Sequence, residues 1–314
     1  FRRLGRSLPG YKEGRMMQMR HMTPAAKKEA KEGYLFILPW LVGFLIFTFG
    51  PLVASIFLSL SKWDIFSEPE FIGMANYAKM FGDPLFKKSL WNTFYYTIFS
   101  IPLGMAGGLS LALLLNQKVK GLPIFRTLFY LPSVTSGVAV ALLWKWIFNP
   151  EFGIANAILG WFGLPALQWL SSPNWAMPAL IIMSLWGVGG GMLIYLAGLQ
   201  GIPGQLYEAA ELDGAGTWSG FVNITLPMLS PTLFFQLITG IIGSFQIFTQ
   251  AFVMTNGGPV NATLFYVLYL YRNAFQWWKM GYASALAWFL FIIILLLTLL
   301  QFKLSKRWVN YDVL

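Results

Sequence analysis

Long apolar stretches alternate with short polar segments along this chain, and six of the stretches are long enough to cross a lipid bilayer. At a rise of 1.5 Å per residue, about 20 helical residues cross a hydrocarbon core roughly 30 Å thick. Helices are expected because an open sheet would leave backbone groups without hydrogen bonds in lipid. We therefore predict an all-α integral membrane protein whose six transmembrane helices cover approximately residues 34–60, 91–116, 125–148, 177–200, 224–248 and 282–302.

Two regions between these stretches fit the pattern less simply. Residues 149–174 carry Trp161 and Trp169 among glycines and prolines. We expect an outer loop there, lying against the membrane interface where tryptophan is favoured. The apolar run within residues 262–279 is too short to span. A short interfacial or outward-facing helix is favoured there over a seventh span.

Composition supports a bilayer location and excludes several kinds of site. Charged residues make up 11% of the chain, against about 25% in a soluble globular protein. There is no cysteine, which excludes disulfides and thiolate metal sites, and the single histidine is His21 in a basic segment. We expect no metal site, no catalytic residues and no cofactor bound by this chain itself. The net charge of +10 could suggest nucleic acid, but no nucleic-acid motif accompanies it.

Basic residues predict the orientation of the spans. If the N-terminus is cytoplasmic, 15 Lys and Arg residues lie on the cytoplasmic side and seven on the other side. The positive-inside rule then places both termini in the cytoplasm. We expect a basic cytoplasmic segment (1–33), a transmembrane domain (34–303) with a polar cytoplasmic loop at 203–222, and a cytoplasmic tail (304–314).

The loop before the fifth span is acidic in a basic protein. It contains Glu208, Glu211 and Asp213, and residues 201–222 contain no Lys or Arg. Good helix formers predict a short helix that glycine ends, with its acidic residues near the N-terminus, where the helix dipole favours them. The small side chains of Ala209 and Ala210 would let a partner approach the backbone closely. This loop is therefore a predicted docking surface.

The same loop resembles a known coupling element. The string Glu208-Ala209-Ala210, Gly214 and Ile224-x-Leu226-Pro227 resembles the coupling loop in the membrane subunits of binding-protein-dependent ABC importers. The resemblance implies the type I importer permease fold and a bacterial plasma membrane location. It also implies two partner ATP-binding subunits, which would bind ATP and Mg. The residues that it assigns to the ATPase contact are Glu208, Ala209, Ala210, Asp213 and Gly214.

Two later segments are similar to the sugar-importing branch of that family. They are Thr255-Asn256-Gly257-Gly258-Pro259 and Gly281-Tyr282-Ala283-Ser284-Ala285. This similarity narrows the resemblance to maltose-type and glycerol-phosphate-type subunits that pair with a second, non-identical permease. It implies a sugar substrate and an extracytoplasmic sugar-binding protein as a further partner.

A substrate pathway is predicted from neutral polar residues in the fourth and fifth spans. No Asp or Glu lies within the six spans, which argues against proton- or sodium-driven transport and for energy supplied by a partner. Hydroxyl, amide and aromatic groups suit a sugar, and the family resemblance points to the same two spans. Packing between helices remains an alternative role for each residue. The candidates are Trp186, Gly187, Gly190, Tyr195, Gln236, Gly240, Ser244, Gln246 and Ile247.

Other functions remain open at the level of sequence, although each lacks a motif. A channel would need a filter or a charged pore ring, and a membrane enzyme would need a catalytic dyad or a metal cluster. The chain contains no phosphate-binding loop, so it is not itself the ATPase. Within the importer family, an oligosaccharide is the first expectation, and a monosaccharide or a glycerol-phosphate-type solute is the second.

Overall fold

A computed structural model describes residues 24–117 and 120–310. The chain comprises two compact units that divide between Ala54 and Ser55. Most of the predicted basic segment, residues 1–23, and the last four residues of the predicted tail lie outside the described residues.

The first unit is a long helical stretch with one turn of wider register. It contains α1 (Pro24–Phe44), the π-helical turn η1 (Leu45–Phe49) and the start of α2 (Gly50–Ser59). The Gly50 backbone N–H donates to the Leu45 carbonyl, five residues back. Pro51 follows and has no N–H, so the regular i to i−4 pattern cannot continue through this point. Proline chemistry therefore gives a local reason for the π-helical turn.

The second unit is also almost entirely helical. Its only described strands are β1 (Ser61–Lys62) and β2 (Glu70–Phe71), an antiparallel pair of two residues each. The helices are α3 (Ala75–Gly82), α4 (Pro84–Leu115), α5 (Leu122–Val134), α6 (Gly137–Ile147), α7 (Ile154–Trp161), α8 (Ala176–Ser184), η2 (Leu185–Gly187), α9 (Val188–Gln200), α10 (Gly204–Leu212), α11 (Thr217–Gly220), η3 (Phe221–Thr225), α12 (Leu226–Met228), α13 (Ser230–Phe245), η4 (Ala251–Thr255), α14 (Tyr266–Tyr271), η5 (Arg272–Gln276) and α15 (Met280–Ser305).

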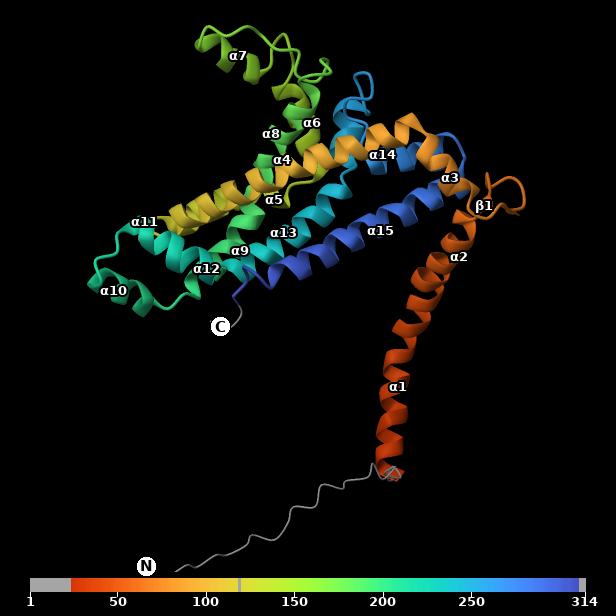
Figure 1. The fold of residues 1–314 in the computed structure, drawn as a ribbon, viewed down its shortest axis with the longest axis horizontal. Helices are drawn as coiled ribbons and strands as arrows, with labels where there is room; N and C mark the ends of the chain where they lie inside the picture. The colour runs from red at the N-terminus through yellow and green to blue at the C-terminus, as the bar shows by residue number, and fades with distance from the viewer. Residues whose placement is uncertain (1–23, 118–119, 311–314) are drawn as a thin grey trace, which may run out of the picture. The chain divides into compact units, whose positions relative to one another are not determined.

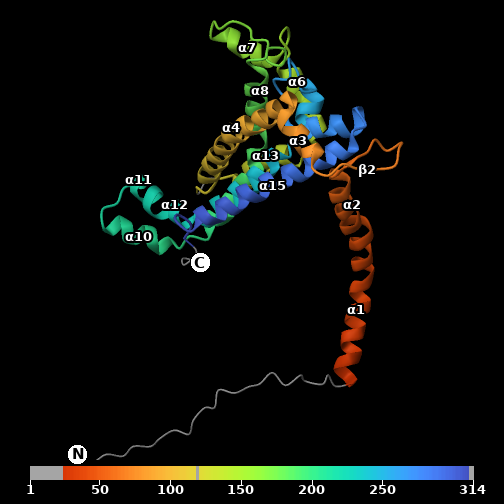
Figure 2. The same cartoon turned by 45° about the vertical axis from the view of Figure 1, so that its right-hand side comes forward.

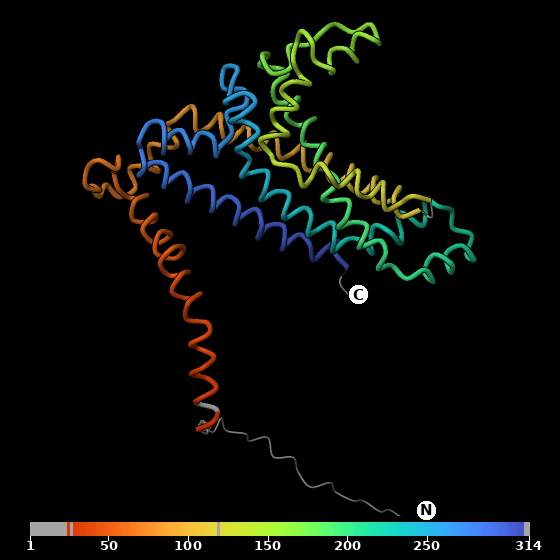
Figure 3. The backbone as a smooth tube through the Cα atoms, turned by 180° about the vertical axis from the view of Figure 1, so that it is seen from behind, coloured from red at the N-terminus to blue at the C-terminus, as the bar shows by residue number. Residues whose placement is uncertain are grey.

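Within this unit, α4 is packed along α9 and α13, and α15 is packed against α13 and α3. Figure 1 shows α10 and α11 at one end of the unit and α3 with the start of α15 at the other. The turned view in Figure 2 and the tube in Figure 3 show the same separation. The largest buried side chains, including Tyr195, Phe245 and Tyr266, lie between these helices. The unit therefore joins two distant ends through a few long helices.

The prediction of an all-α membrane protein is confirmed. Among the described residues, four helices are long and apolar enough to cross a membrane: Lys28–Ser59, Pro84–Leu115, Ala176–Gln200 and Met280–Ser305. Two further pairs pass the same test but are bent, Leu122–Val134 with Gly137–Ile147 by 97° and Thr217–Met228 with Ser230–Phe245 by 63°. If each bent pair is one span, the number is six. Prolines near both bends, such as Pro132 and Pro231, remove helical hydrogen bonds there.

The second span begins seven residues earlier than its hydropathy suggests. Asp83 caps α4, because its side-chain Oδ1 accepts from the N–H groups of Leu85 and Phe86 at 2.9 and 3.4 Å. Pro84 occupies the first helical position, where its missing N–H costs nothing. Lys87 and Lys88 lower the hydropathy of this first turn, so the capping residue, not the apolar run, sets where the helix starts.

The two ambiguous regions differ in how far they are buried. In residues 149–174, Trp161 is 82% exposed, but Trp169 is 7% exposed and donates to Asn156 Oδ1 at 2.8 Å. The expectation that both tryptophans face the membrane interface is therefore wrong for Trp169. In residues 262–279, α14 and η5 together are too short to span, and the buried Tyr266 donates its hydroxyl to the Leu286 carbonyl at 2.8 Å.

Candidate functional site

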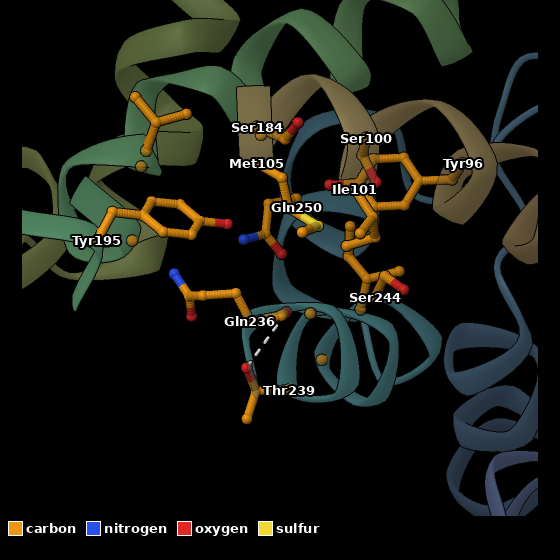
Figure 4. Close-up of a pocket in the computed structure, with 17 residues that line it drawn as sticks. Tyr96, Ser100, Ile101, Met105, Ser184, Tyr195, Gln236, Thr239, Ser244 and Gln250 are labelled. Carbon is orange, nitrogen blue, oxygen red and sulfur yellow. Dashed lines mark hydrogen bonds between the residues drawn. The ribbon is translucent and has the colours of Figure 1, made fainter. Parts of the chain in front are cut away.

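A cavity of about 440 Å³ opens between α4, α9 and α13, beside the middle turns of α4 (Figure 4). Its volume falls within the roughly 300–1,000 Å³ that small-molecule sites occupy. From α4 it is lined by Tyr96, Ser100, Ile101, Gly104 and Met105. The other walls are Ser184, Gly187, Val188, Gly191, Tyr195, Gln236, Thr239, Gly240, Gly243, Ser244, Ile247 and Gln250.

One buried hydroxyl group in the cavity wall has no hydrogen-bond partner among the described residues. It is Tyr195 OH, on a side chain that is 0% exposed. Figure 4 shows the Tyr195 hydroxyl and the Gln250 amide pointing into the space between the three helices. A buried polar group costs free energy unless it is hydrogen-bonded. The wall therefore offers unused donors and acceptors to a ligand that carries hydroxyl groups.

The cavity wall is also electrically neutral. None of the residues that line it is Asp, Glu, Lys, Arg or His. Aromatic, amide, hydroxyl and glycine residues alternate around it instead. A charged ligand would find no counter-ion among these lining residues, whereas a neutral polyhydroxylated ligand would find hydrogen-bonding groups beside aromatic rings.

The structure brings together six of the nine residues predicted for the substrate pathway. Lining the cavity are Gly187, Tyr195, Gln236, Gly240, Ser244 and Ile247. Ser244 already donates to the Ile241 carbonyl, and its hydroxyl lies 2.9 Å from that of Thr97, so its hydrogen-bonding capacity is largely used. This hydroxyl is therefore a weaker candidate for ligand contact than that of Tyr195.

The other three predicted residues lie elsewhere. Trp186 lines a neighbouring cavity of about 330 Å³, to which Gly187 also contributes. Gly190 faces α5, since a Cβ there would lie 3.5 Å from Ser133 Cβ. Gln246 follows the last residue of α13 and is exposed. These residues surround the cavity without forming its wall.

Sequence reasoning missed the contribution of the second span. Tyr96, Ser100 and Gly104 follow one another at intervals of four, so they lie on one face of α4. All three line the cavity, as do Ser184 and Gln250. The spacing of polar and small residues on an otherwise apolar helix is the signal that could have found them.

The predicted coupling segment folds as a short helix, α10, followed by α11. Glu208 and Ala209 are exposed on it, and Leu212 is 90% exposed. The helix begins at Gly204, so its acidic residues lie in its second half and Asp213 is its C-cap. The expectation that they lie near the N-terminus is wrong. The helix dipole disfavours negative charge at this end, so α10 itself does not stabilise the cluster.

Gly214 ends α10 in a defined way. Its φ is +80°, a conformation that glycine adopts without strain. Its N–H donates to the Glu211 carbonyl at 3.0 Å, and the next N–H, of Ala215, donates to the Ala210 carbonyl at 2.9 Å. This pair of bonds is the Schellman motif, and it turns the chain back toward the membrane helices.

A side-chain hydrogen bond ties α10 to the base of the fifth span. The Tyr207 hydroxyl lies 2.8 Å from Thr225 Oγ1, which belongs to η3 and is buried. The exposed acidic face of α10 and the helix that leads into α13 are therefore linked directly. Because α13 carries Gln236 and Gly240, the coupling segment and the cavity share one helical path.

A family model supplies the identification. Residues 89–310 match the family described as binding-protein-dependent transport system inner membrane component. The chain belongs to this family. The match runs from residue 89, in the second turn of α4, past the end of α15, and it includes both the cavity and the coupling segment.

Individual relatives are similar to this chain over most of their length. The chain is 44% identical to a probable ABC transporter permease, YesP, of Bacillus subtilis, over 91% of this chain and 94% of the relative. It is 36% identical to the arabinooligosaccharides transport system permease AraP of the same organism, over 91% and 95%. It is 35% identical to the trehalose/maltose transport system permease MalF of Thermococcus litoralis, over 89% and 95%. The resemblance drawn from the coupling loop and the later motifs is thereby confirmed.

Solved structures confirm the fold. A bacterial ABC transporter involved in the import of the acidic polysaccharide alginate is similar with a TM-score of 0.78 and 28% identity, over 89% of this chain and 96% of that chain. The alginate transporter in complex with a pentasaccharide-bound periplasmic protein gives a TM-score of 0.79 and 26% identity over the same shares. The chain therefore has the ABC importer permease fold that the sequence predicted.

Proposed function

We propose that this chain is one membrane subunit of an ATP-driven importer that moves a neutral sugar, first of all an oligosaccharide, into the cytoplasm of a bacterium. A sugar-binding protein outside the plasma membrane would deliver the sugar. The observation that carries the proposal is the uncharged cavity between α4, α9 and α13, with its unpartnered Tyr195 hydroxyl. A hydroxyl group of a sugar would satisfy it, and sugar C–H faces would pack on the Tyr96 ring.

The absence of charged residues from the cavity wall supports a neutral substrate, whereas the fold does not distinguish neutral from charged substrates. The similar alginate transporter imports an acidic polysaccharide with the same architecture. Relatives with substrate names, such as the arabinooligosaccharide and trehalose/maltose permeases, handle sugars. The absence of a cation from the cavity wall disfavours a phosphorylated solute for this chain.

Energy would come from partners. In this proposal the chain pairs with a second homologous permease, and two ATP-binding subunits carry ATP and Mg. One of these subunits receives α10 through Glu208, Ala209, Ala210, Asp213 and Gly214. Support comes from the exposure of Glu208 and Ala209 and from the acidic residues, which α10 does not itself stabilise. Closure of the ATP-binding subunits would move α10, and through α12 and α13 it would switch access to the cavity between the two sides of the membrane.

The test is a reconstituted complex in nanodiscs, assayed for ATP hydrolysis with a panel of sugar-loaded binding proteins. We expect one loaded binding protein to stimulate hydrolysis and Glu208→Lys to abolish the stimulation. Glu151→Lys, an equally exposed charge reversal between α6 and α7, is the matched control and keeps it. If Glu208→Lys leaves stimulated hydrolysis and transport intact, α10 is not the docking element.

The same proteins test the orientation. Because the chain has no cysteine, a single Leu212→Cys variant can be labelled from one side of sealed vesicles. We expect a membrane-impermeant label to reach Leu212→Cys from the cytoplasmic side and a Phe152→Cys variant, 60% exposed in wild type, from the other side. Labelling of both from one side would overturn the proposed topology.

A further inference from the structure

The bend between α12 and α13 lies where the coupling segment meets the cavity helix. The segments Thr217–Met228 and Ser230–Phe245 meet at 63°, and Leu229 between them is 0% exposed. A movement of α10 that passes along the chain toward Gln236 and Gly240 of the cavity crosses this point. What holds the bend therefore decides how faithfully such a movement is passed on.

Two prolines spaced four apart create the bend. In a regular helix, the carbonyl of Pro227 would accept a hydrogen bond from the N–H of residue 231. Residue 231 is proline, which has no N–H and whose ring presses against that same carbonyl. The Pro227 carbonyl accepts instead from Ser230 Oγ, at 2.6 Å. A serine hydroxyl thus replaces the missing backbone donor at the hinge.

The C-terminal segment completes this replacement. The Asn310 backbone N–H donates to Ser230 Oγ at 2.9 Å, although the two residues are 80 positions apart. The result is a relay from the Asn310 N–H through the Ser230 hydroxyl to the Pro227 carbonyl. Ser230 is 2% exposed, so water does not readily substitute for either partner.

Side chains of the same segment pack on the first turns of α13. After α15 ends at Ser305, the chain turns, with the N–H groups of Trp308 and Val309 donating to the Ser305 carbonyl at 3.0 and 2.8 Å. The Trp308 ring then meets Phe234 edge to face at 6.0 Å between centroids. Phe234 and Val309 are both buried. Figure 1 and Figure 2 show the end of α15 beside α12.

Helix α9 also packs against the bend. A Cβ added at Gly198 would lie 2.8 Å from Leu229 Cδ2 and 2.8 Å from Thr232 Oγ1. The bend therefore touches the α9 backbone directly and has no room to move that way. Residues 306–310 follow the end of α15, so their contacts with the bend can be released without moving a membrane-spanning helix.

We propose that residues 306–310 are a positioning clamp that sets the angle between the coupling segment and α13. With the clamp seated, a displacement of α10 moves α13 as one body. With the clamp released, the α12–α13 bend absorbs the displacement, and ATP hydrolysis proceeds without a matching movement of the cavity. The statement about hydrolysis rests on the proposed function, whereas the mechanical role of the clamp does not.

Spin labels measure the bend itself. In the cysteine-free chain, Trp218→Cys and Phe235→Cys place labels on either side of the bend at positions that are 75% and 53% exposed in wild type. The distance distribution is recorded in the assembled complex in nanodiscs, with cysteine-free partner subunits. We expect Ser230→Ala to broaden it and to change the ratio of conformers by about fivefold, the change expected for one buried hydrogen bond. Trp308→Ala, which removes the ring contact with Phe234, is expected to broaden it as well.

Two substitutions elsewhere in the chain are matched controls. Ser59 is 1% exposed, donates to the carbonyl three residues back at 2.7 Å and accepts from Tyr77 OH at 2.9 Å, so its bonding copies that of Ser230. Trp288 lies on α15 and donates to Ser55 Oγ at 3.0 Å, away from the bend. Ser59→Ala and Trp288→Ala are expected to leave the distribution unchanged. Distributions like wild type in both Ser230→Ala and Trp308→Ala would overturn the clamp.

The number of sugars transported per ATP hydrolysed separates this inference from the proposed function. We expect Trp308→Ala, which lies outside the spans, to lower that ratio several-fold while the complex stays assembled. If Glu208→Lys keeps full transport but Ser230→Ala still broadens the distribution, the proposed coupling role of α10 fails and the clamp stands. If Glu208→Lys uncouples the complex but Ser230→Ala and Trp308→Ala have no effect on the distribution, the clamp fails and the proposed function stands.

Discussion

Tyr282 donates its hydroxyl hydrogen to Asp83 Oδ2 at 3.0 Å, although 199 positions separate the two residues in the chain. The Tyr269 hydroxyl donates to the same oxygen. The other carboxylate oxygen accepts from the first N–H groups of α4. One carboxylate therefore joins the start of α4 to α14 and α15, at the end of the unit away from α10.

Asp83→Asn is expected to destabilise the protein at neutral pH by about 1 kcal/mol or more, because hydrogen bonds to a charged group are stronger than those to a neutral one. Burial tends to raise the pKa of Asp83, but the hydrogen bonds from Tyr269, Tyr282 and the backbone outweigh it and hold the pKa below its ordinary value of 3.8. The stabilisation is then complete above pH 4 and is lost as the pH falls through the lower folded value.

Thermal unfolding of the purified protein between pH 3 and pH 7 checks the direction of this pH dependence. The difference in Tm between wild type and Asp83→Asn should be constant at neutral pH and should narrow below pH 4. Glu151→Gln, which removes an exposed carboxylate whose side chain makes no hydrogen bond among the described residues, is expected to track wild type throughout. A difference that grows toward acid would show that the Asp83 carboxylate does not stabilise the fold.

Neighbouring glycines of α9 are expected to respond very differently to alanine. A Cβ at Gly189 would lie 1.9 Å from the Phe129 carbonyl oxygen, so Gly189→Ala forces α9 and α5 apart. A Cβ at Gly190 would make only an ordinary contact of 3.5 Å with Ser133. We expect Gly189→Ala to cost about 1–3 kcal/mol or to prevent assembly, and Gly190→Ala to be tolerated. Equal melting temperatures of the two variants would contradict the α5–α9 packing.

These glycines show how far the sequence alone could be taken. The run from Gly187 to Gly191 marks close packing, and hydropathy places the helix around it. Nothing in the sequence tells which glycine meets the backbone of α5 and which opens on the cavity, because a 3.6-residue period turns each successive position by about 100° toward a different neighbour. That assignment needs the packing of α5 against α9, which places Phe129 against Gly189.

The same limit explains why the sequence predicts only part of the cavity wall. The fourth and fifth spans are predicted to line a pathway because their polar residues are dense. Tyr96, Ser100 and Gly104, by contrast, are scattered in a long apolar helix. Their common face becomes meaningful only once α4 is seen to pack on both α9 and α13. The coupling segment, by contrast, was predictable to within a turn, because glycine and proline fix its ends locally.

Tyr195→Phe is expected to separate stability from sugar response. The Tyr195 hydroxyl is buried in the cavity wall with no partner in the described part of the chain, so its removal costs the fold nothing and can raise the Tm. A bound sugar would lose a hydrogen bond. The apparent affinity of transport for the sugar should therefore fall by roughly tenfold. Transport measured against sugar-loaded binding protein in proteoliposomes checks this.

Tyr266→Phe is the control with the opposite signature. Its hydroxyl is satisfied by the Leu286 carbonyl and lies outside the cavity wall, so its loss should lower the Tm and leave the sugar response unchanged. If Tyr195→Phe behaves like Tyr266→Phe, the Tyr195 hydroxyl serves the fold and not the ligand.

The contact between Tyr207 and Thr225 yields a prediction about coupling. Tyr207→Phe removes the 2.8 Å hydrogen bond that ties α10 to η3 but keeps the ring and the exposed acidic face. A loss of about 0.5–1.5 kcal/mol at this joint should leave ATP-binding subunits docked while fewer hydrolysis events produce transport. The ratio of sugar transported to ATP hydrolysed, measured in proteoliposomes, is expected to fall by a factor of two to about ten.

Tyr95→Phe is the control for this prediction and should keep the wild-type ratio. Tyr95 lies on an exposed face of α4, and its hydroxyl makes no hydrogen bond among the described residues. A Tyr207→Phe complex with normal coupling would mean that this hydrogen bond does not carry the movement of α10 to α13.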